Sequence, residues 1–333
     1  MIISKTPYRI SFFGGGSDYP SWYLKNGGSV LSSTIDKHIY ITCRNLPPFF
    51  DHKYRFVWSQ IEKVKSVNQI KHNAVREMLK YYKMKNGLEI HYDGDLPARS
   101  GVGSSSVFVV GLMNLLNNFI GKKIKKEKLA RESIIFEQDI LKEVVGSQDQ
   151  IAAVYGGFNK IIFKKNGNFN VNKININLNK INNLNKNLLL VYTGYKRTAH
   201  DIAKSYVNKL RSTKEKHILR ILSYVKEGEY ILKEGKLDDF GKLLHESWLE
   251  KKRLSTSISN SKIDDIYNRA IKNGALGGKL LGAGGGGFFL FYVPHLKKRY
   301  FLRKMNYLTN VPFKFSFKGS EILFNNKNKK IIL

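Results

Sequence analysis

The feature that most constrains this chain is a loop of glycines and serines that leads directly into an apolar run. The loop spans Asp95 to Ser106, and the apolar run continues from Val107 to Met113. A small-residue turn that opens a helix leaves backbone N–H groups unpaired, and the helix dipole adds partial positive charge there. Such a place suits a phosphate group, and the serine hydroxyls could contact phosphate or a magnesium ion. Alone, the loop is weak evidence of a site, because many Gly/Ser turns only start helices.

Two further glycine runs flank this loop in the chain. The first follows a strand that carries Arg9, and it consists of three glycines before Asp18. The second runs from Gly274 to Gly287 and is followed by an apolar strand. That strand excludes a dinucleotide-binding loop, which must open a helix, and Leu280 after Lys279 excludes a Walker A loop. Three such runs indicate close approach of backbone to a ligand or to other backbone at several places.

Two acidic residues stand between the second and third glycine runs. Glu137 falls in the middle of a predicted helix, and Asp149 lies in a Gly-Ser-Gln-Asp turn before an apolar helix. Taken singly, Glu137 could be an ordinary solvated residue and Asp149 a helix cap.

Length and composition are those of a globular protein with room for two domains. The chain has 333 residues, of which 42% are hydrophobic, and a single cysteine, Cys43, which excludes an intrachain disulfide. No apolar run is long enough to span a bilayer and the N-terminus lacks the apolar core of a signal peptide, so we expect a cytoplasmic protein without a membrane partner. The net charge of +31 comes largely from dispersed lysines, which we interpret as solvated helix faces and tails.

Hydrophobic periodicity divides the chain into strand-rich and helix-rich halves. It predicts helices over 107–119, 126–145 and 263–273, and strands over 29–44, 88–92, 188–192 and 288–293. Residues 201–254 should be helical with breaks near 227–228 and 234–235, and the Asn/Ile/Lys-rich residues 166–187 should form an alternating strand or loop. We therefore expect an α+β chain of two domains, residues 1–187 and 188–333.

Taken together, the three glycine motifs resemble those of the GHMP kinase superfamily, in its order and spacing and over nearly the whole chain. Pro7 to Asp18 is similar to the first motif, Pro97 to Ser106 to the phosphate loop, and Gly277 to Gly287 to the third motif. The resemblance implies an N-terminal domain like that of some ribosomal proteins, a ferredoxin-like C-terminal domain, and ATP-dependent phosphoryl transfer.

The resemblance also implies roles for individual residues. Glu137 and Ser105 match the residues that hold Mg²⁺, which prefers hard oxygen ligands. Asp149 matches the acid that accepts the proton of the attacking hydroxyl or orients it, and Arg9 matches the basic residue beside that acid. The residues expected to bind ATP are Pro97, Arg99, Gly101, Val102, Gly103, Ser104, Ser105 and Ser106.

The first motif carries the expectation about the substrate. Its Gly-Gly-Gly-Ser-Asp-Tyr-Pro string departs from the galactokinase form and is similar to D-glycero-D-manno-heptose 7-phosphate kinases and to L-fucokinase kinase domains. We expect phosphorylation of the anomeric hydroxyl of the heptose to the 1,7-bisphosphate, in nucleotide-activated heptose synthesis for a surface polysaccharide. An L-fucokinase-like or other sugar 1-kinase is the alternative. The residues expected to bind the sugar phosphate are Gly15, Gly16, Ser17, Asp18, Arg197, Gly284 and Gly285.

An RNA-binding protein is the alternative of another class, suggested by the positive charge. It leaves Arg9, Asp18, Glu137 and Asp149 without a role, and no RNA-binding motif interleaves aromatic and basic residues. We therefore do not expect nucleic acid as a partner. The oligomeric state stays open, with a homodimer among the alternatives.

Overall fold

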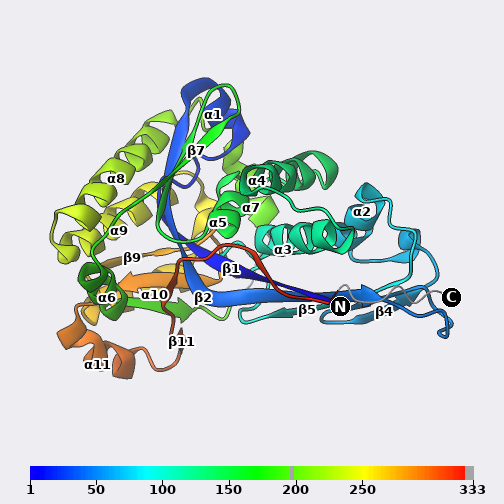
Figure 1. Ribbon diagram of the computed structural model, residues 1–333. Coiled ribbons are helices and arrows are strands. Elements are labelled where there is room, and N and C mark those ends of the chain that lie inside the picture. Colours follow the sequence, from blue (N-terminus) through cyan, green and yellow to red (C-terminus); the bar gives the residue numbers. More distant parts are fainter. Residues whose placement is uncertain (196–198, 327–333) are drawn as a thin grey trace.

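The computed structural model describes residues 1–195 and 199–326. Within these residues the strands form one sheet of nine and one of four. In Figure 1 the larger sheet runs across the molecule beneath α2 (Asn73–Tyr81), α3 (Ser104–Phe119) and α4 (Lys126–Ile135). The smaller sheet lies at the other end, with α8 (Glu215–Lys233) and α9 (Leu237–Lys252) beside it. Each sheet thus has its own helical cover.

The larger sheet is built around two long antiparallel strands, β1 and β2, paired from Ile2 opposite Cys43 to Phe13 opposite Leu31. Its path is β13-β1-β2-β5-β3-β4, while β12 and β6 pair with β2, and β7 pairs with β6. Its strands are β1 (Ile2–Phe13), β2 (Gly28–Asn45), β3 (Tyr54–Val57), β4 (Ile61–Val64), β5 (Leu88–Gly94), β6 (Asn159–Phe163), β7 (Phe169–Lys173), β12 (Phe315–Ser316) and β13 (Glu321–Asn325).

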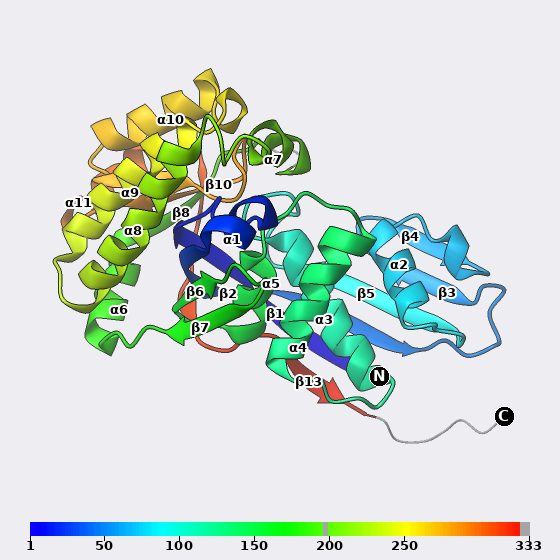
Figure 2. The same cartoon turned by 90° about the horizontal axis from the view of Figure 1, so that it is seen from above.

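Helices α2, α3, α4 and α5 (Gln148–Tyr155) gather on one face of this sheet (Figure 2), whereas α6 (Leu178–Asn187) lies beside α11 (His295–Lys304) of the second half. The central one, α3, packs against β1 and β2 and is buried from Ser106 to Asn117 because it is apolar nearly all round. The helices and short turns of this half are α1 (Pro20–Asn26), η1 (Val67–Gln69), α2 (Asn73–Tyr81), α3 (Ser104–Phe119), α4 (Lys126–Ile135), η2 (Phe136–Ile140), α5 (Gln148–Tyr155) and α6 (Leu178–Asn187).

The smaller sheet is antiparallel and has the order β11-β8-β10-β9. Its first strand in sequence lies between the fourth and the third, as in a ferredoxin-like fold. Its strands are β8 (Leu188–Tyr192), β9 (Gly277–Leu280), β10 (Phe288–Tyr292) and β11 (Thr309–Val311); its helices and turns are α7 (Ala199–Val207), α8 (Glu215–Lys233), α9 (Leu237–Lys252), η3 (Thr256–Ile258), α10 (Ser261–Lys272) and α11 (His295–Lys304).

Aromatic packing joins the two halves. The ring of Phe240 on α9 lies edge-on to Phe12 and Phe13 of β1, with centroid distances of 5.3 and 5.2 Å. Edge-to-face pairs at this distance are favourable beyond the area they bury. The end of β1, which leads into the first glycine motif, is thereby fixed against the second half.

The α+β fold expected from the sequence is confirmed, and the boundary after residue 187 stays a prediction. The two sheets do not follow this boundary strictly, because β12 and β13 belong to the larger sheet although they lie near the end of the chain. Among the described residues, no helix has both the length and the apolar character needed to cross a bilayer.

Three predictions of local structure were wrong. The helix expected over 126–145 ends at Ile135, and a π turn, η2, follows over Phe136–Ile140. The break expected at Gly228 does not occur, because α8 runs through it. A Cβ atom on Gly228 would lie 2.5 Å from the ring of Phe13, so this glycine permits close packing rather than ending a helix.

The third wrong prediction concerns residues 166–187, of which only Phe169–Lys173 form a strand. Leu178–Asn187 form α6, whose Ile181 and Leu184 are buried and whose first turn is capped by the side chain of Asn177. The repeated asparagines masked this amphipathic helix, because asparagine is a poor helix former but a good cap.

Candidate active site

The phosphate loop joins β5 to α3 through backbone that favours glycine. Gly101 and Gly103 have φ values of +84° and +81°, and Gly103 begins α3 without a capping side chain. The first N–H groups of the helix are therefore left for a ligand, as a phosphate site requires. Of the three serines, Ser105 is exposed, Ser106 is buried, and the Ser104 hydroxyl accepts a hydrogen bond from Arg99 N at 3.2 Å.

Contacts of Pro97, Val102 and Arg99 shape the phosphate loop, and their predicted contact with ATP stays a prediction. Ser100 donates from its hydroxyl to Pro97 O at 2.6 Å, and Val102 is fully buried with its carbonyl accepting from Arg9 N. Arg99 is exposed and has a φ of +60°, which an arginine adopts only when the surrounding structure imposes it. The backbone path is thus fixed from both ends.

Glu137 reaches this loop from the π turn η2. It is fully buried, and its carboxylate accepts hydrogen bonds from the Ser105 hydroxyl at 2.9 Å and from the Gln150 amide. Burial, and to a smaller extent the charge of Asp149, raise the pKa of Glu137 to about 7, against the hydrogen bonds that the carboxylate accepts. A buried carboxylate beside a serine hydroxyl is a pair of hard oxygen ligands, so these residues fit a divalent cation.

Arg9 and Asp149 form a bidentate pair next to the phosphate loop. Arg9 Nε and Nη2 donate to the two carboxylate oxygens of Asp149, each at 2.6 Å, and Nη1 donates to Gly101 O at 2.8 Å. A Cβ atom on Gly103 would lie 3.2 Å from Asp149 Oδ2, which places this carboxylate against the start of α3. Such a fork of hydrogen bonds fixes the carboxylate in orientation as well as charge.

Asp18 is held by the first glycine motif and by the segment before α5. Its carboxylate accepts from Gly16 N and from the Gln148 side chain, both at 2.9 Å, while its backbone carbonyl accepts from Ser147 N. Burial and, to a smaller extent, the charge of Asp149 raise the pKa of Asp18 to about 6. Gln148, which binds Asp18, is the neighbour of Asp149 in the chain, so the two carboxylates lie in one region of the molecule.

The other predicted sugar-binding residues of the first motif differ in their contacts. Gly15 is partly exposed, whereas Ser17 is fully buried and its hydroxyl donates to Gly14 O and Ser29 O. The contacts of Ser17 therefore stabilise the turn that presents Asp18. Its predicted contact with substrate stays a prediction, as does that of Gly15. Arg197 lies outside the described residues.

The third glycine motif packs directly on the phosphate loop. A Cβ atom on Gly282 would lie 2.6 Å from Gly101 Cα, and Phe288 N donates to Ser100 O at 3.0 Å. Gly284 and Gly285 instead lie against Ile258, whose carbonyl accepts from Gly285 N at 2.8 Å. This motif thus supports the phosphate loop, and a substrate contact from Gly284 or Gly285 remains a prediction.

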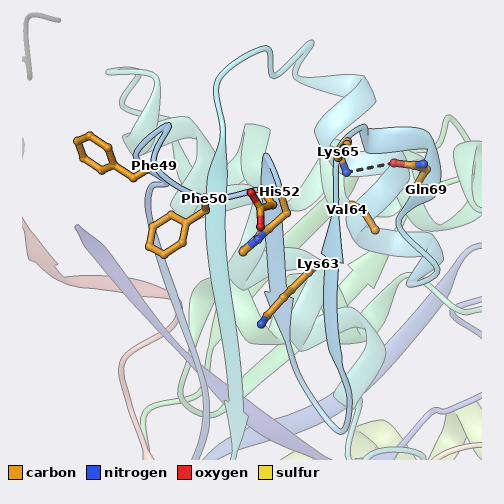
Figure 3. Close-up of a pocket in the computed structure, with 8 residues that line it drawn as sticks. Phe49, Phe50, His52, Lys63, Val64, Lys65 and Gln69 are labelled. Atoms are coloured by element: carbon orange, nitrogen blue, oxygen red, sulfur yellow. Dashed lines mark hydrogen bonds between the residues drawn. The ribbon is translucent and has the colours of Figure 1, made fainter.

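A separate pocket lies elsewhere in the molecule. It measures about 670 Å³ and lies at the start of the β3–β4 hairpin, where Figure 3 shows Phe49 and Phe50 on the preceding loop and Lys63 on β4. It contains no residue of the three glycine motifs. Its lining residues are Phe49, Phe50, Asp51, His52, Lys63, Val64, Lys65 and Gln69.

The sequence of this chain is similar to those of known proteins. Family models described as the GHMP kinases N terminal domain and GHMP kinases C terminal match residues 68–157 and 229–304. A heptose 7-phosphate kinase of Campylobacter jejuni is 31% identical over 89% of this chain and 91% of its own. The chain belongs to the GHMP kinase family. The first match contains the phosphate loop, Glu137 and Asp149, and the predicted class of ATP-dependent sugar kinase is confirmed.

Other members of the GHMP kinase family are more distant. An L-fucokinase/L-fucose-1-P guanylyltransferase of Bacteroides fragilis is 26% identical over 86% of this chain, which spans 34% of that longer protein. The solved structure of a D-glycero-D-manno-heptose 1-phosphate kinase from Bacteroides thetaiotaomicron has a TM-score of 0.80 and covers 98% of this chain and 100% of its own at 22% identity. That likeness supports the fold.

Several residues of this GHMP kinase site were missed by reasoning from the sequence. Gln148 and Gln150 flank Asp149, and each orients an acid, Asp18 and Glu137 respectively. A Cβ atom on Gly146 would lie 1.9 Å from Asp18 Oδ2, so only glycine leaves room for that carboxylate. The signal was present in the stretch Gly-Ser-Gln-Asp-Gln, but sequence alone does not show which acid each glutamine faces.

Aromatic rings around the first turns of α3 were also missed. The ring of Phe108 lies 5.3 Å from both His72 and Tyr92, and Trp58 lies 4.9 Å from His72. These four residues come from four different segments of the chain, so no local pattern joins them. They place an aromatic surface one turn along α3 from the phosphate loop.

Proposed function

We propose that this kinase transfers the γ-phosphoryl group of ATP to the anomeric hydroxyl of D-glycero-D-manno-heptose 7-phosphate. The hydroxyl oxygen forms a bond to the γ-phosphorus, the bond to the β–γ bridging oxygen breaks, and ADP and the 1,7-bisphosphate leave. The observation that carries the proposal is the Arg9–Asp149 pair, with two hydrogen bonds of 2.6 Å, set against the phosphate loop. The substrate is supported by the first motif and by the heptose phosphate kinase that shares 31% of its residues.

Phosphoryl transfer depends on alignment and on charge neutralisation more than on covalent chemistry. Asp149 accepts the proton of the attacking hydroxyl or orients that hydroxyl, and Arg9 holds its carboxylate in place. Arg9 also adds positive charge beside the transferred group. Asp18 is fixed by Gly16 and Gln148 and offers an acceptor to a sugar hydroxyl.

Mg²⁺ is the proposed cofactor, and Ser105 and Glu137 are the residues that would hold it. When bound, it would neutralise phosphate charge on ATP. Within residues 1–195 and 199–326, no group of three or more His, Cys, Asp or Glu residues is arranged for a metal. A cation with a serine and one carboxylate completes its shell with phosphate and water, which is the usual arrangement for Mg²⁺ in kinases.

The aromatic surface around Phe108 is the proposed position of the purine. Trp58 is partly exposed there, and its indole N–H donates to Glu62 at 3.2 Å, which fixes the ring. An aromatic ring held in this way offers a face for stacking by a base. Because the proposed substrate is a sugar phosphate, we also propose that the protein acts in the cytoplasm, in nucleotide-activated heptose synthesis for a surface polysaccharide.

The experiment that tests this function is identification of the product. Purified protein is incubated with ATP, Mg²⁺ and heptose 7-phosphate, and the product is examined by phosphorus and proton NMR. We expect a second phosphate coupled to the anomeric proton. A phosphate on any other carbon, or ADP formed without sugar phosphorylation, would contradict the proposal.

A further inference from the structure

Lys251 carries an ammonium group that points into the protein and has no role in the proposed reaction. It lies in the last turn of α9, and its ammonium donates to Leu280 O at 2.7 Å and to Gly282 O at 2.6 Å. The ammonium also lies 5.8 Å from the centre of the Trp248 ring, and among the described residues it forms no ion pair with a carboxylate. Its charge is therefore matched by backbone carbonyls rather than by a carboxylate.

The electrostatic surroundings make this arrangement costly. Burial lowers the pKa of Lys251 well below its ordinary value, and the positive charges of Lys279 and Arg9 lower it further. Lys279 is itself buried and donates to Phe12 O at 2.6 Å. A cation in such a place destabilises the fold unless its hydrogen bonds compensate.

The carbonyls that Lys251 binds border the contact between the third glycine motif and the phosphate loop. A Cβ atom on Gly101 would lie 2.6 Å from Leu281 O, the carbonyl between the two that Lys251 holds. Gly101 O in turn accepts from Arg9 Nη1 at 2.8 Å, and the same guanidinium binds Asp149. A continuous series of contacts thus links Lys251 to the Arg9–Asp149 pair through one glycine loop and the phosphate loop.

We propose that Lys251 is a positioning residue, which holds the third glycine motif so that Gly101 and Arg9 are placed for phosphoryl transfer. In this role it acts through Leu280 and Gly282. Its loss should leave the fold intact and let the phosphate loop relax. Since misplacement by about 1 Å can cost about 100-fold in rate, the effect should appear in kcat and in ATP affinity.

The same helix offers a matched control. Lys252 follows Lys251 in the sequence, and its ammonium also lies 5.8 Å from the Trp248 ring, but it pairs with Asp264 at 3.0 Å. Lys252→Met therefore removes an equal charge from the same turn without touching the glycine loop. Lys251→Arg keeps a cation and its donors.

The test compares Lys251→Met, Lys251→Arg and Lys252→Met with the unmodified protein. For Lys251→Met we expect kcat to fall by about 10- to 100-fold, KM for ATP to rise, and KM for the sugar to stay within about threefold. Lys251→Arg should recover most of the loss, and Lys252→Met should change nothing. Equal losses in both methionine variants, or a Lys251→Met protein within twofold in kcat and KM for ATP, would overturn the proposal.

The inference rests on the proposed kinase function, and binding separates the two. Affinity for Mg²⁺ and ADP is measured by calorimetry on the same proteins without sugar. Weaker binding in Lys251→Met than in Lys252→Met supports the positioning role whichever sugar is the substrate, and equal binding contradicts it. A wild-type protein that binds the nucleotide but phosphorylates fucose instead of heptose 7-phosphate would refute the substrate alone.

Discussion

At the scale of single residues, the site depends on three acids in different surroundings. Asp149 is fixed by a guanidinium, Asp18 by an amide and a backbone N–H, and Glu137 by a hydroxyl and an amide. The family resemblance pointed to all three acids, to Arg9 beside Asp149 and to Ser105 beside Glu137. It did not give Gln148 and Gln150 as partners of Asp18 and Glu137, since the sequence does not show which acid each glutamine faces.

Replacing Asp149 by asparagine tests the role of the carboxylate. The amide keeps the shape but cannot accept the proton, so we expect kcat to fall by about 100- to 10,000-fold with nucleotide affinity little changed. Asp139→Asn is the control, because Asp139 is exposed on the π turn two residues from Glu137. Steady-state ADP release measures both. A fall of less than tenfold in Asp149→Asn would rule out this role.

The raised pKa of Glu137 predicts a pH-dependent stability in metal-free protein. Because burial raises that pKa from 4.5 to about 7, the protonated form favours the fold, and stability should be lost as pH rises through about 7. Each unit of difference is worth about 1.4 kcal/mol. In EDTA, the melting temperature of Glu137→Gln should therefore exceed that of wild type at pH 8 and equal it at pH 4.

The pKa of Asp18 is also raised, but Asp18 is present in both wild type and Glu137→Gln. The difference in melting temperature between the two proteins therefore reports on Glu137 alone. Added Mg²⁺ should narrow the gap at pH 8, since a cation favours the ionised carboxylate. A constant difference in melting temperature at both pH values would show that Glu137 does not titrate there.

At the scale of elements, local patterns predicted most strands and helices and failed where tertiary contact decides. Gly228 lies within α8, and it is a glycine because the ring of Phe13 occupies the place of a side chain there. The π turn η2, which carries the buried Glu137, replaces the end of a predicted helix. The contact between the third motif and the phosphate loop joins residues more than a hundred positions apart, so no local pattern gives it. The family resemblance implied that Gly282 to Gly287 lies against the first two loops, and the structure places Gly282 against Gly101.

Substitution of Gly282 tests that contact. Alanine there would place a methyl group 2.6 Å from Gly101 Cα at a φ of +67°, so we expect destabilisation by about 1–3 kcal/mol and weaker ATP binding. Gly194→Ala is the control, since Gly194 has a φ of +79° but nothing within 4 Å of an added Cβ atom. It carries the backbone strain without the clash. Thermal unfolding and KM for ATP that change equally in both variants would show that the contact is unimportant.

At the scale of the whole molecule, the sequence predicted a two-domain kinase fold and the structure adds how its ends connect. The net charge of +31 is dispersed, yet it is not all solvated as predicted, because Lys251 and Lys279 bind backbone carbonyls inside the molecule. Lys279, whose ammonium binds Phe12 O, and Phe240 against Phe12 and Phe13 join the second half to the strand that carries Arg9. The acids and the phosphate loop of the site thus belong to the first half, and the third glycine motif of the second half packs against them.

The most direct test of the central claim is a comparison of kcat/KM for several acceptors in one ADP-release assay with ATP and Mg²⁺. The acceptors are heptose 7-phosphate, mannose 6-phosphate, L-fucose and galactose, each with wild type and with Asp149→Asn. We predict that heptose 7-phosphate exceeds every other acceptor by at least about 100-fold, a difference of about 2.7 kcal/mol in transition-state binding, and that Asp149→Asn abolishes it. Preferred turnover of L-fucose, or full activity in Asp149→Asn, would contradict the account.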